Sequence, residues 1–370
     1  MSNSIDSPQV LVLLSDITFG GIAVQAKGHA EELYRRRIGA GICLLNGAGM
    51  DGKLRDWYTE QMPLDTTLVS TGSAPWGIRV FKYFRLFKKR SETIFHFHCF
   101  SQEFINWQAI LAAKLAGKTV VATLHHTVAW TRNRFHASSL LQRLAWKATD
   151  KFIVTTDAGK DLVGKHIPKY KIIVIPCHVP QGTTTRSAPD IRAELGFAGD
   201  EFVIVSVARL VETKGLTELA SAVARLHRSH PKVKLMIIGE GPSYASLNQI
   251  AEKSPNICLL GKVASIHDYL QIANLFALPS FEEGFGIVYV EAAHYGIPSI
   301  ASALPQVKEV VVDGKTGWLV APGNISELKD TIVSVQASPK ECLRRGQNAM
   351  LYCRKFLPEV VIDQIVALYR

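Results

Sequence analysis

The sequence predicts an α/β protein made of two doubly wound domains. Short apolar runs rich in β-branched residues alternate with longer helical patterns along the whole chain. Continuous apolar strands separated by helices are typical of parallel sheets that are covered on both faces. The length of 370 residues exceeds what one hydrophobic core usually serves, so two domains are expected.

The predicted strands form two series on either side of a segment between Pro176 and Asp190. This segment is rich in Pro, Ser, Thr and Gly and has no periodicity, which is typical of a linker. We therefore predict an N-terminal domain over residues 1–178 and a C-terminal domain over residues 179–355. The predicted strands are residues 9–14, 92–98, 118–124, 151–156 and 171–176 in the first domain, and 201–207, 233–239, 256–261 and 275–280 in the second.

Composition excludes several classes of protein. With 47% hydrophobic and 20% charged residues the chain is expected to be globular rather than disordered. The six cysteines are far apart and form no C-x-x-C pair, which argues against a disulfide framework or a zinc ribbon and favours a reducing cytoplasm. The first residues do not resemble a signal peptide, and no apolar run reaches the ~18 residues that would span a bilayer.

The positive charge is confined to the N-terminal half. Residues 1–180 contain 23 Lys and Arg against 13 Asp and Glu, whereas residues 181–370 contain 19 of each. The densest basic segment is residues 77–90, where Val80, Phe81, Phe84 and Phe87 would form an apolar stripe on a helix. Two interpretations remain open for residues 79–90: contact with an anionic membrane surface, or a helix packed on the sheet with a solvated basic face.

Polar residues follow five of the predicted strands. Parallel sheets bind their ligands beyond the carboxyl ends of their strands, so residues at these positions are the first candidates for a binding site. They are His98, His125, Arg209, the segment Gly239-Glu240-Gly241, and Glu283.

Two segments of the second domain predict a phosphate site. In ARLVETKG (208–215), Arg209 ends a strand and Lys214 lies next to the start of a helix, where an anion would be stabilised by both cations and by free N–H groups. In IIGEGP (237–242), Gly239 and Gly241 would let the backbone approach a ligand closely.

The segment FEEGFGIVYVEAAHYGIP (281–298) predicts a strand end, a glycine turn and a helix of about nine residues that stops at Gly296. Gly284 and Gly286 would bring the helix start against a phosphate, and Glu283 and Glu291 would flank it. Because carboxylates accept hydrogen bonds from hydroxyl groups, a pyrophosphate with a hydroxyl-bearing ring at each end satisfies this pattern. That description fits a nucleotide sugar.

The C-terminal half resembles the retaining glycosyltransferase family four, of GT-B architecture, in which two Rossmann-like domains face an interdomain cleft. The matching elements are ARL followed by KG, IIGEGP, NLFALPS, EGFGIVYVEA, YGIP and DGKTGWLV, which span about residues 200–322 in the family's order. The N-terminal half matches more loosely through Gly20-Gly21, FHFH and TLH. In this architecture the apolar-striped helix within residues 356–370 would join the N-terminal domain; the alternative is that it stays with the second.

The resemblance implies a role for individual residues. It implies that Glu291 binds the ribose hydroxyls, Glu283 the transferred sugar, and Arg209 with Lys214 the diphosphate. The donor site would be completed by Gly239, Gly241, Gly284, Phe285, Gly286 and the backbone amides near Ile287 and Val288. His125 would lie at the sugar from the opposite domain, and the cleft near the acceptor would be lined by Gly20, Gly21 and His98.

The sequence departs from the family pattern at three places. Ala208 replaces a glycine before Arg209, His126 stands where an Asp is frequent, and Cys177-His178 replaces Asn-Gly. His96 and the pair Cys177-His178 are expected to be structural, because the sequence offers neither of them a further metal ligand at a supporting spacing.

The implied activity is transfer of a hexose from a nucleotide-diphosphate sugar, UDP-linked in the first place and GDP-linked in the second. The acceptor would be a saccharide, with a lipid-linked one included, in polysaccharide or lipopolysaccharide synthesis at the inner face of the plasma membrane. The chain has no D-x-D motif, so a metal-independent, retaining enzyme without a cofactor is expected. Two alternatives are a nucleotide-sugar epimerase and a basic nucleic-acid-binding protein; the sequence shows no aromatic-rich nucleic-acid module.

Overall fold

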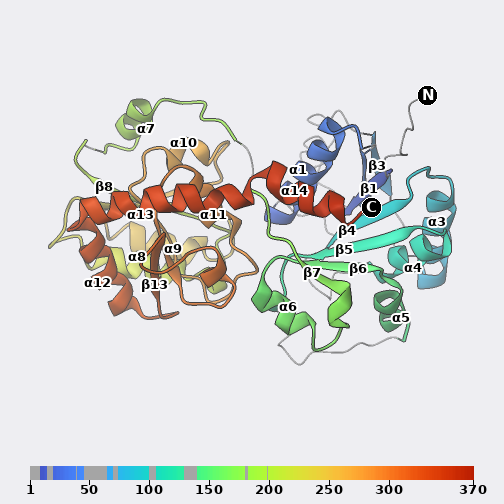
Figure 1. Cartoon of the computed structure of the whole chain (residues 1–370). Helices are drawn as coiled ribbons and strands as arrows, with labels where there is room; N and C mark the ends of the chain where they lie inside the picture. The colour runs from blue at the N-terminus through green and yellow to red at the C-terminus, as the bar shows by residue number, and fades with distance from the viewer. Residues whose placement is uncertain are drawn as a thin grey trace. The chain divides into compact units, whose positions relative to one another are not determined.

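The structure is a computed structural model that describes residues 9–14, 20–38, 40–45, 65–69, 74–99, 106–128, 140–179, 182–197 and 199–370. The chain forms two compact units (Figure 1). Unit 1 comprises Met1–Pro180 and Leu357–Arg370, and unit 2 comprises Gln181–Phe356. The C-terminal segment therefore belongs to the same unit as the N-terminal half of the chain.

Unit 1 is built on a seven-stranded parallel sheet in the order β3-β2-β1-β4-β5-β6-β7. The chain adds strands outward from β1 to β3 and then continues on the other side of β1 with β4. The point where the order reverses, between β1 and β4, is where doubly wound sheets bind ligands. The strands are β1 (Val10–Leu14), β2 (Ala40–Leu45), β3 (Asp65–Val69), β4 (Ile94–Cys99), β5 (Thr119–Leu124), β6 (Lys151–Val154) and β7 (Ile172–Val174).

Helices cover both faces of this sheet, and the alternation of side chains along β1 shows which helices lie on which face. Leu11 and Leu13 belong to a buried cluster with side chains of α3 (Trp76–Lys88), α4 (Trp107–Leu115) and α5 (Leu140–Ala148). Val10, Val12 and Leu14 belong to a second cluster with side chains of α1 (Gly21–Arg35) and α14 (Pro358–Ala367). Because both faces are covered, the central strand β1 is apolar throughout rather than alternating. A shorter helix, α6 (Asp157–Val163), precedes β7.

Unit 2 is built on a six-stranded parallel sheet in the order β10-β9-β8-β11-β12-β13. Its order reverses between β8 and β11. The strands are β8 (Phe202–Val207), β9 (Val233–Ile238), β10 (Ile257–Gly261), β11 (Leu275–Leu278), β12 (Ser299–Ser302) and β13 (Gly317–Val320). The helices are α7 (Ala188–Glu194), α8 (Leu216–Ala224), α9 (Tyr244–Ala251), α10 (His267–Leu270), α11 (Ile287–His294), α12 (Ile325–Gln336) and α13 (Pro339–Tyr352).

The starts of the helices differ in one respect that bears on binding. Asn106, Thr156, Ser187 and Asn324 each accept a hydrogen bond from an amide in the first turn of the helix that follows. The helices α8 and α11 begin instead at glycines in the left-handed region, which offer no side-chain cap. The N-cap residues of these two helices therefore offer no side-chain acceptor to the first backbone amides of the helix. The helix interior cannot supply an acceptor for these amides either.

The nine strands predicted from the sequence are all present, with each end within two residues of its predicted position, and the fold class is confirmed. The sequence analysis missed four strands: β2, β3, β12 and β13. The segments SIAS and GWLV of β12 and β13 are only four residues long and contain Ser or Gly, and DTTLV of β3 is mostly polar. Their strand conformation follows from pairing in the sheet rather than from local propensity.

The basic segment forms α3 as predicted, but its apolar stripe is not packed as expected. Phe87 is fully buried, and Val80 and Phe84 are partly buried against the sheet. Phe81, predicted to share that stripe, is 58% exposed, and Tyr83 is buried instead. A helix turns about 100° per residue, so residue 81 lies off the face set by residues 80, 84 and 87. The expectation for Phe81 was therefore wrong.

Candidate active site

Three loops meet at the carboxyl edge of the unit 2 sheet. They follow β8 (residues 208–215), β9 (residues 239–243) and β11 (residues 279–286), and these strands are neighbours in the sheet. Backbone hydrogen bonds join the loops: the amide of Leu210 donates to the carbonyl of Glu240 at 2.8 Å, and that of Phe281 to Thr213 at 2.8 Å. The three loops therefore form one surface at the point where the strand order reverses.

Three glycines make this close contact between loops feasible. A Cβ atom added at Gly239 would lie 1.9 Å from the carbonyl oxygen of Ala208, and one at Gly215 would lie 2.1 Å from that of Pro279. Gly241 would meet the carbonyl of Leu210 at 2.4 Å. All three also have a positive φ, which L side chains rarely adopt. The packing of the loops therefore requires glycine at these three positions, with or without a ligand.

We expect Gly239→Ala to lower the free energy of unfolding of unit 2 by roughly 3 kcal/mol, because strain in φ adds to the clash with Ala208. Gly314→Ala is the matched control, since Gly314 also has a positive φ but its added Cβ would meet nothing within 4 Å. This control should cost about 1 kcal/mol. Urea unfolding measures both, and equal losses would show that the loop contact contributes nothing.

A partly buried ion pair lies within this surface. Lys214 Nζ donates to Glu283 Oε1 at 2.7 Å, and Ser280 Oγ donates to the same oxygen at 2.9 Å. The side chain of Glu283 is 7% exposed and that of Lys214 is 23% exposed. The sequence assigned these two residues to different parts of one ligand; the structure places them in direct contact, on the loops that flank the reversal of strand order.

The start of α11 adjoins this pair. Gly286 has φ +83°, and an added Cβ would lie 2.5 Å from the ring of Tyr289, so the turn into the helix requires glycine. Ile287 and Val288 supply the first amides of the helix and are half-buried. Gly284 is buried, and Phe285 points into the interior. The centroids of the Phe285 and Phe356 rings lie 5.4 Å apart. Phe285 therefore offers a ligand its backbone rather than its side chain.

Glu291 lies inside α11 and is 7% exposed. Burial raises the pKa of its carboxyl group to about 7, because the ionised form is poorly solvated there. The neighbouring Tyr289 is buried as well and donates its hydroxyl to the carbonyl of Leu278 at 2.6 Å, which ties α11 to the end of β11. Arg209, by contrast, is exposed in the loop after β8.

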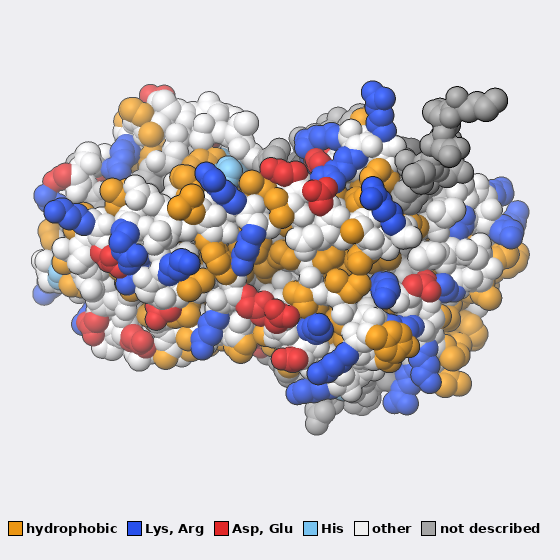
Figure 2. Space-filling view, in the orientation of Figure 1, with side chains coloured by type: hydrophobic (Ala, Val, Ile, Leu, Met, Phe, Trp, Pro, Cys, Tyr) orange, Lys and Arg blue, Asp and Glu red, His pale blue; other side chains and the backbone are white. Residues whose placement is uncertain are grey.

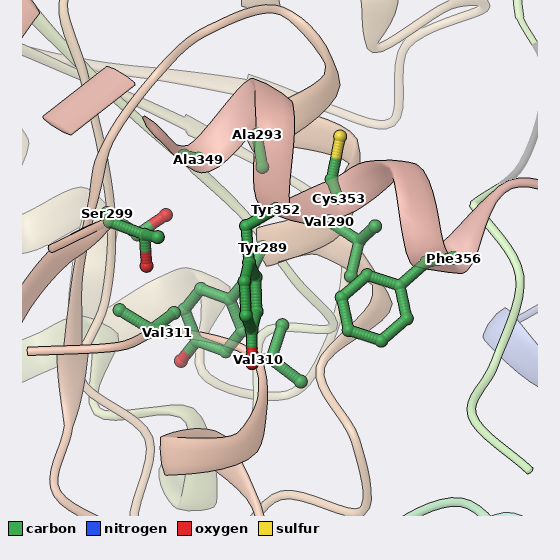
Figure 3. A pocket seen from close by; sticks show the side chains of 11 residues that line it. Tyr289, Val290, Ala293, Ser299, Val310, Val311, Ala349, Tyr352, Cys353 and Phe356 are labelled. Carbon is green, nitrogen blue, oxygen red and sulfur yellow. The ribbon is translucent and has the colours of Figure 1, made fainter. Parts of the chain in front are cut away.

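The opposite side of α11 is closed by packing. A cavity of about 10 Å³ is lined there by side chains of α11, α13 and the segment before β13, among them Tyr289, Val311 and Tyr352 (Figure 3). Its volume suits at most a single water molecule. This packing therefore leaves no room for a larger ligand on that side of α11.

Glu291→Gln should stabilise unit 2 at pH 8. The folded-state pKa of about 7 lies above the ordinary value of 4.5, so the carboxyl favours folding less as pH rises through 7. The neutral amide removes that loss, which for this fully buried group is about 3 kcal/mol. Thermal unfolding at pH 8 and pH 5 tests this: the gain should be large at pH 8 and small at pH 5, and a gain independent of pH would contradict it.

The predicted residues of unit 1 fall into two groups. Gly20 precedes α1 and Gly21 begins it, and a Cβ added at Gly20 would meet nothing within 4 Å, so this turn is open. His98 and His125 are 3% and 9% exposed and belong to a buried cluster of histidines. His98 Nδ1 lies 2.9 Å from His125 Nε2, and His125 Nδ1 lies 3.8 Å from the thiol of Cys177. Both ring nitrogens of His125 thus face partners inside unit 1.

Two residues that were expected to be structural have partners that the sequence did not show. His96 is a fully buried core residue, as expected, but it is not isolated: nitrogen atoms of His29, His96 and His98 lie within 4.8 Å of one another. Cys177 does have a partner, the ring of His125. No pattern in the sequence pointed to His29 or to Tyr369, because α1 and the C-terminal segment contact β4 only in the folded unit.

Two family models match the chain. Glycosyltransferase Family 4 matches residues 19–181, and Glycosyl transferases group 1 matches residues 187–351. The two matches together cover most of both units. The match to residues 187–351 contains the site described above. The chain belongs to glycosyltransferase family 4. Its two doubly wound units are those of the GT-B fold, and the resemblance stated from the sequence motifs is confirmed.

Individual relatives of this glycosyltransferase are distant. The putative glycosyltransferase EpsD of Bacillus subtilis is 27% identical over 182 residues, which are 48% of this chain and 48% of that protein. The alpha-monoglucosyldiacylglycerol synthase of Acholeplasma laidlawii is 28% identical over 78% of this chain and 77% of the relative. The match thus spans about half the length of EpsD and about three quarters of the synthase.

A solved structure shares the fold over the whole chain. The crystal structure of Anabaena HepE in complex with UDP and glucose has a TM-score of 0.79, is 21% identical, and covers 98% of this chain and 99% of that one. At this level of identity the likeness establishes the GT-B fold of the glycosyltransferase.

Proposed function

We propose that this glycosyltransferase moves a hexose from a nucleotide-diphosphate sugar to a saccharide acceptor, with retention of configuration and without a metal ion. The observation that carries the proposal is the Lys214–Glu283 ion pair next to the uncapped start of α11. A buried acid that binds hydroxyls, a cation and free helix amides are the groups that a sugar diphosphate needs in one place.

The donor is bound by unit 2 in this proposal. The diphosphate lies against the first amides of α11, with Arg209 and Lys214 as its cations. The transferred sugar meets Glu283, and the ribose meets Glu291, whose carboxyl group at neutral pH can either accept or donate a hydrogen bond because its pKa is about 7. A UDP-sugar is the first choice and a GDP-sugar the second; HepE was crystallised with UDP and glucose.

The chemistry follows from where charge develops. As the bond between the sugar and the diphosphate lengthens, positive charge builds on the ring and negative charge on the departing phosphate. Arg209, Lys214 and the helix start stabilise that negative charge, and a preorganised donor of this kind is worth about 3 kcal/mol. These positively charged side chains balance the negative charge of the departing diphosphate, as a divalent cation does in other transferases. The proposed reaction therefore requires no metal or cofactor.

A panel of nucleotides tests the donor. The melting temperature should rise with UDP or, failing that, GDP, and rise further with the matching nucleotide sugar. Transfer to a saccharide acceptor, followed by NMR of the new anomeric centre, then reports retention. If the protein consumes its donor without any acceptor and returns an isomer of it, the activity is that of an epimerase and the proposal fails.

We also propose that unit 1 docks on an anionic membrane, as expected for a lipid-linked acceptor in polysaccharide or lipopolysaccharide synthesis at the cytoplasmic face of the plasma membrane. The exposed stripe of α3 begins with Ile78 and Phe81 and continues with Lys82, Arg85 and Lys88. The exposed stripe of α5 has the same order, Leu140, Leu144 and then Lys147, with Arg143 between them. Exposed apolar and basic side chains thus occur together on both helices.

The charge of this face is of one sign. Residues 76–90, 107–118 and 140–148, which contain α3, α4 and α5, include ten Lys and Arg and no Asp or Glu. These helices are neighbours, and Figure 2 shows hydrophobic and basic side chains side by side over the part of unit 1 that carries them. No helix in the described ranges is long and apolar enough to cross a bilayer. Docking of such a face therefore relies on anionic lipid and shallow apolar insertion.

The triple variant Lys82→Gln, Arg85→Gln, Lys88→Gln should reduce sedimentation with vesicles of 30% anionic phospholipid by at least tenfold, because each cation near the surface is worth about 1 kcal/mol. The control replaces three exposed lysines of unit 2, Lys253, Lys315 and Lys340, with Gln. Phe81→Ser should weaken binding in addition. Equal sedimentation of all variants would refute membrane docking, and binding of duplex or single-stranded nucleic acid that persists at about 150 mM salt would replace it.

A further inference from the structure

A continuous chain of hydrogen bonds runs through the core of unit 1. It starts at the thiol of Cys177, which lies 3.8 Å from His125 Nδ1, and passes from His125 Nε2 to His98 Nδ1 at 2.9 Å. His98 Nε2 then contacts His29 Nδ1 at 3.0 Å. These four residues come from the segment after β7, from the end of β5, from β4 and from α1, so the chain crosses the face of the sheet on which α1 lies.

The hydrogen-bond chain continues to Tyr369, near the C-terminal end of the sequence. His29 Nε2 lies 3.1 Å from the hydroxyl of Tyr369, which also contacts His96 Nδ1. His96 Nε2 contacts Thr123 Oγ1 at 2.7 Å and ends the chain. Each of the four histidines uses both of its ring nitrogens in this series, and each is at most 9% exposed.

Counting protons shows that such a chain has a direction. A neutral imidazole has one N–H donor and one bare nitrogen acceptor, and a hydroxyl or thiol can donate one proton. Between two imidazoles every contact is satisfied only when the donors point the same way. The Tyr369 oxygen could accept from both of its histidine partners, but its own buried proton would then face no acceptor in this series, so a single direction along the chain satisfies all groups. If one imidazole gained a second proton it would donate at both ends, so the donors on its two sides would point in opposite directions and one series would end on the sulfur of Cys177, which is a weak acceptor. The contacts are therefore best satisfied by four neutral rings.

The end at Cys177 sets the direction. Burial raises the pKa of the thiol far above its ordinary value, so the sulfur keeps its proton and donates to His125 Nδ1. His125 then carries its own proton on Nε2 and donates to His98, and the same tautomer follows for His98, His29 and His96. The last proton is received by Thr123 Oγ1. The alternative direction would leave an N–H of His125 pointing at a neutral thiol, which is a weak acceptor.

The surroundings favour neutral rings over a bound cation. Desolvation by burial lowers the pKa of His29, His96, His98 and His125, and the charges that act on them in the described structure are those of other histidines. The cavity beside the chain has a volume of about 20 Å³ and is lined by Gln25, Thr155 and His178 as well as by chain members, without a carboxylate. A divalent ion between His29, His96 and His98 would therefore lack a counter-charge and would have to break hydrogen bonds already made.

We propose that His98, His29 and Tyr369 are positioning residues: together with His96 they form one unidirectional hydrogen-bond chain that holds His125 as a single neutral Nε2–H tautomer. His125 in this role is fixed at the end of β5 rather than free to exchange a proton with a bound sugar. The inference does not rest on the proposed donor or acceptor, because it concerns the resting protein.

The same hydrogen-bond chain contacts two segments of unit 1 that lead into and back from unit 2. Cys177 lies just before the passage into unit 2, and the adjacent His178 is held by Gln25 through a pair of hydrogen bonds of 2.7 and 3.0 Å between side-chain amide and backbone. Tyr369 follows α14, the helix that returns to unit 1. The chain thus links the outgoing segment, α1, the sheet and the returning helix through groups that are all uncharged.

NMR of protein labelled with ¹⁵N-histidine tests the proposal in the full chain, because the shifts of the two ring nitrogens distinguish both neutral tautomers and the imidazolium. At pH 7.5, His29, His96, His98 and His125 should each show the neutral Nε2–H pattern. An imidazolium at any of these positions, or a mixture of tautomers in the wild type, would overturn the proposal. So would a stoichiometric metal ion in the purified protein whose removal by a chelator changes these signals.

Tyr369→Phe provides the second readout. The phenyl ring keeps the packing but leaves His29 Nε2–H without an acceptor, so the protons of His29, His98 and His125 gain by reversing direction. The His125 signal should move toward the Nδ1–H tautomer, although Tyr369 does not touch His125. Tyr170→Phe, at an exposed position of the same unit, should leave all four signals unchanged. If the ring-nitrogen signal of His125 is unaltered in a folded Tyr369→Phe variant, the proposed hydrogen-bond chain is wrong. If that variant does not fold, the wild-type spectrum still decides the question.

Discussion

Glu283→Gln should lower kcat/KM for sugar transfer by about 10³-fold or more while the protein remains folded. Glu283 is the buried acid of the site, and its carboxylate is bound by Lys214 and Ser280 at 2.7 and 2.9 Å. The amide has nearly the same shape but loses the negative charge that faces the hydroxyls and the positive ring of the transition state. Initial rates with a matched donor and acceptor measure the loss.

The controls separate chemistry from stability. Glu282→Gln changes the neighbouring acid, which is half-buried and has no assigned role, and should leave the rate within a few-fold of wild type. Breaking the partly buried pair should also cost about 1–3 kcal/mol of unfolding free energy, since Lys214 then loses its partner. Lys214→Met should impair both transfer and UDP binding. A folded Glu283→Gln enzyme with wild-type transfer would remove Glu283 from the mechanism.

Unit 1 should unfold steeply in acid, before unit 2 does. Burial lowers the pKa of His96 and of His125 to about 3, and that of His29 and His98 well below 6.5. In each case the folded state binds fewer protons than the unfolded state, so the contribution to stability is complete above pH 6.5 and is lost as pH falls from 6.5 toward 3. His96 and His125 alone would lower the unfolding free energy by about 3 kcal/mol per pH unit in that window.

Other groups act on this dependence in known directions. The pKa of His178 is also lowered by burial, although hydrogen bonds with the backbone of Gln25 and Val179 and the charge of Glu32 oppose the shift, so His178 adds to the loss of stability in acid. Glu291 acts oppositely in unit 2, where its raised pKa favours folding as pH falls. Hydrogen exchange followed by mass spectrometry at pH 7, 6 and 5, corrected for the intrinsic rates, reports both units in one sample. A stability of unit 1 that is flat across this range would contradict the buried neutral histidines.

The sequence was informative about the fold and about unit 2 for a physical reason. The apolar runs and the glycine turns are local signals, so β8, β9, β11 and the start of α11 could be placed from ARLVETKG, IIGEGP and FEEGFG. Fold and family are confirmed, whereas the roles of Arg209, Glu283 and Glu291 remain predictions. That Lys214 and Glu283 bind each other could not be read from residues 69 positions apart.

The sequence said little about unit 1 because its polar core is assembled from distant segments. His29, His98, His125, Cys177 and Tyr369 come from α1, β4, the end of β5, the segment after β7 and the C-terminus, and only the sheet order brings them together. Similarly, Phe81 was assigned to the packed stripe of α3 from its neighbours' spacing, but the exposed stripes of α3 and α5 become apparent only once the buried face is known.

Hydrogen exchange with and without a saturating nucleotide diphosphate tests the central claim most directly, since it needs no variant and surveys both units at once. Binding should slow exchange at residues 208–215 and 239–243 and at 280–291, the three loops and the helix start that form the site. Slowed exchange confined to other segments, such as α3 or the edge strands of either sheet, would contradict a donor site built on Lys214, Glu283 and α11.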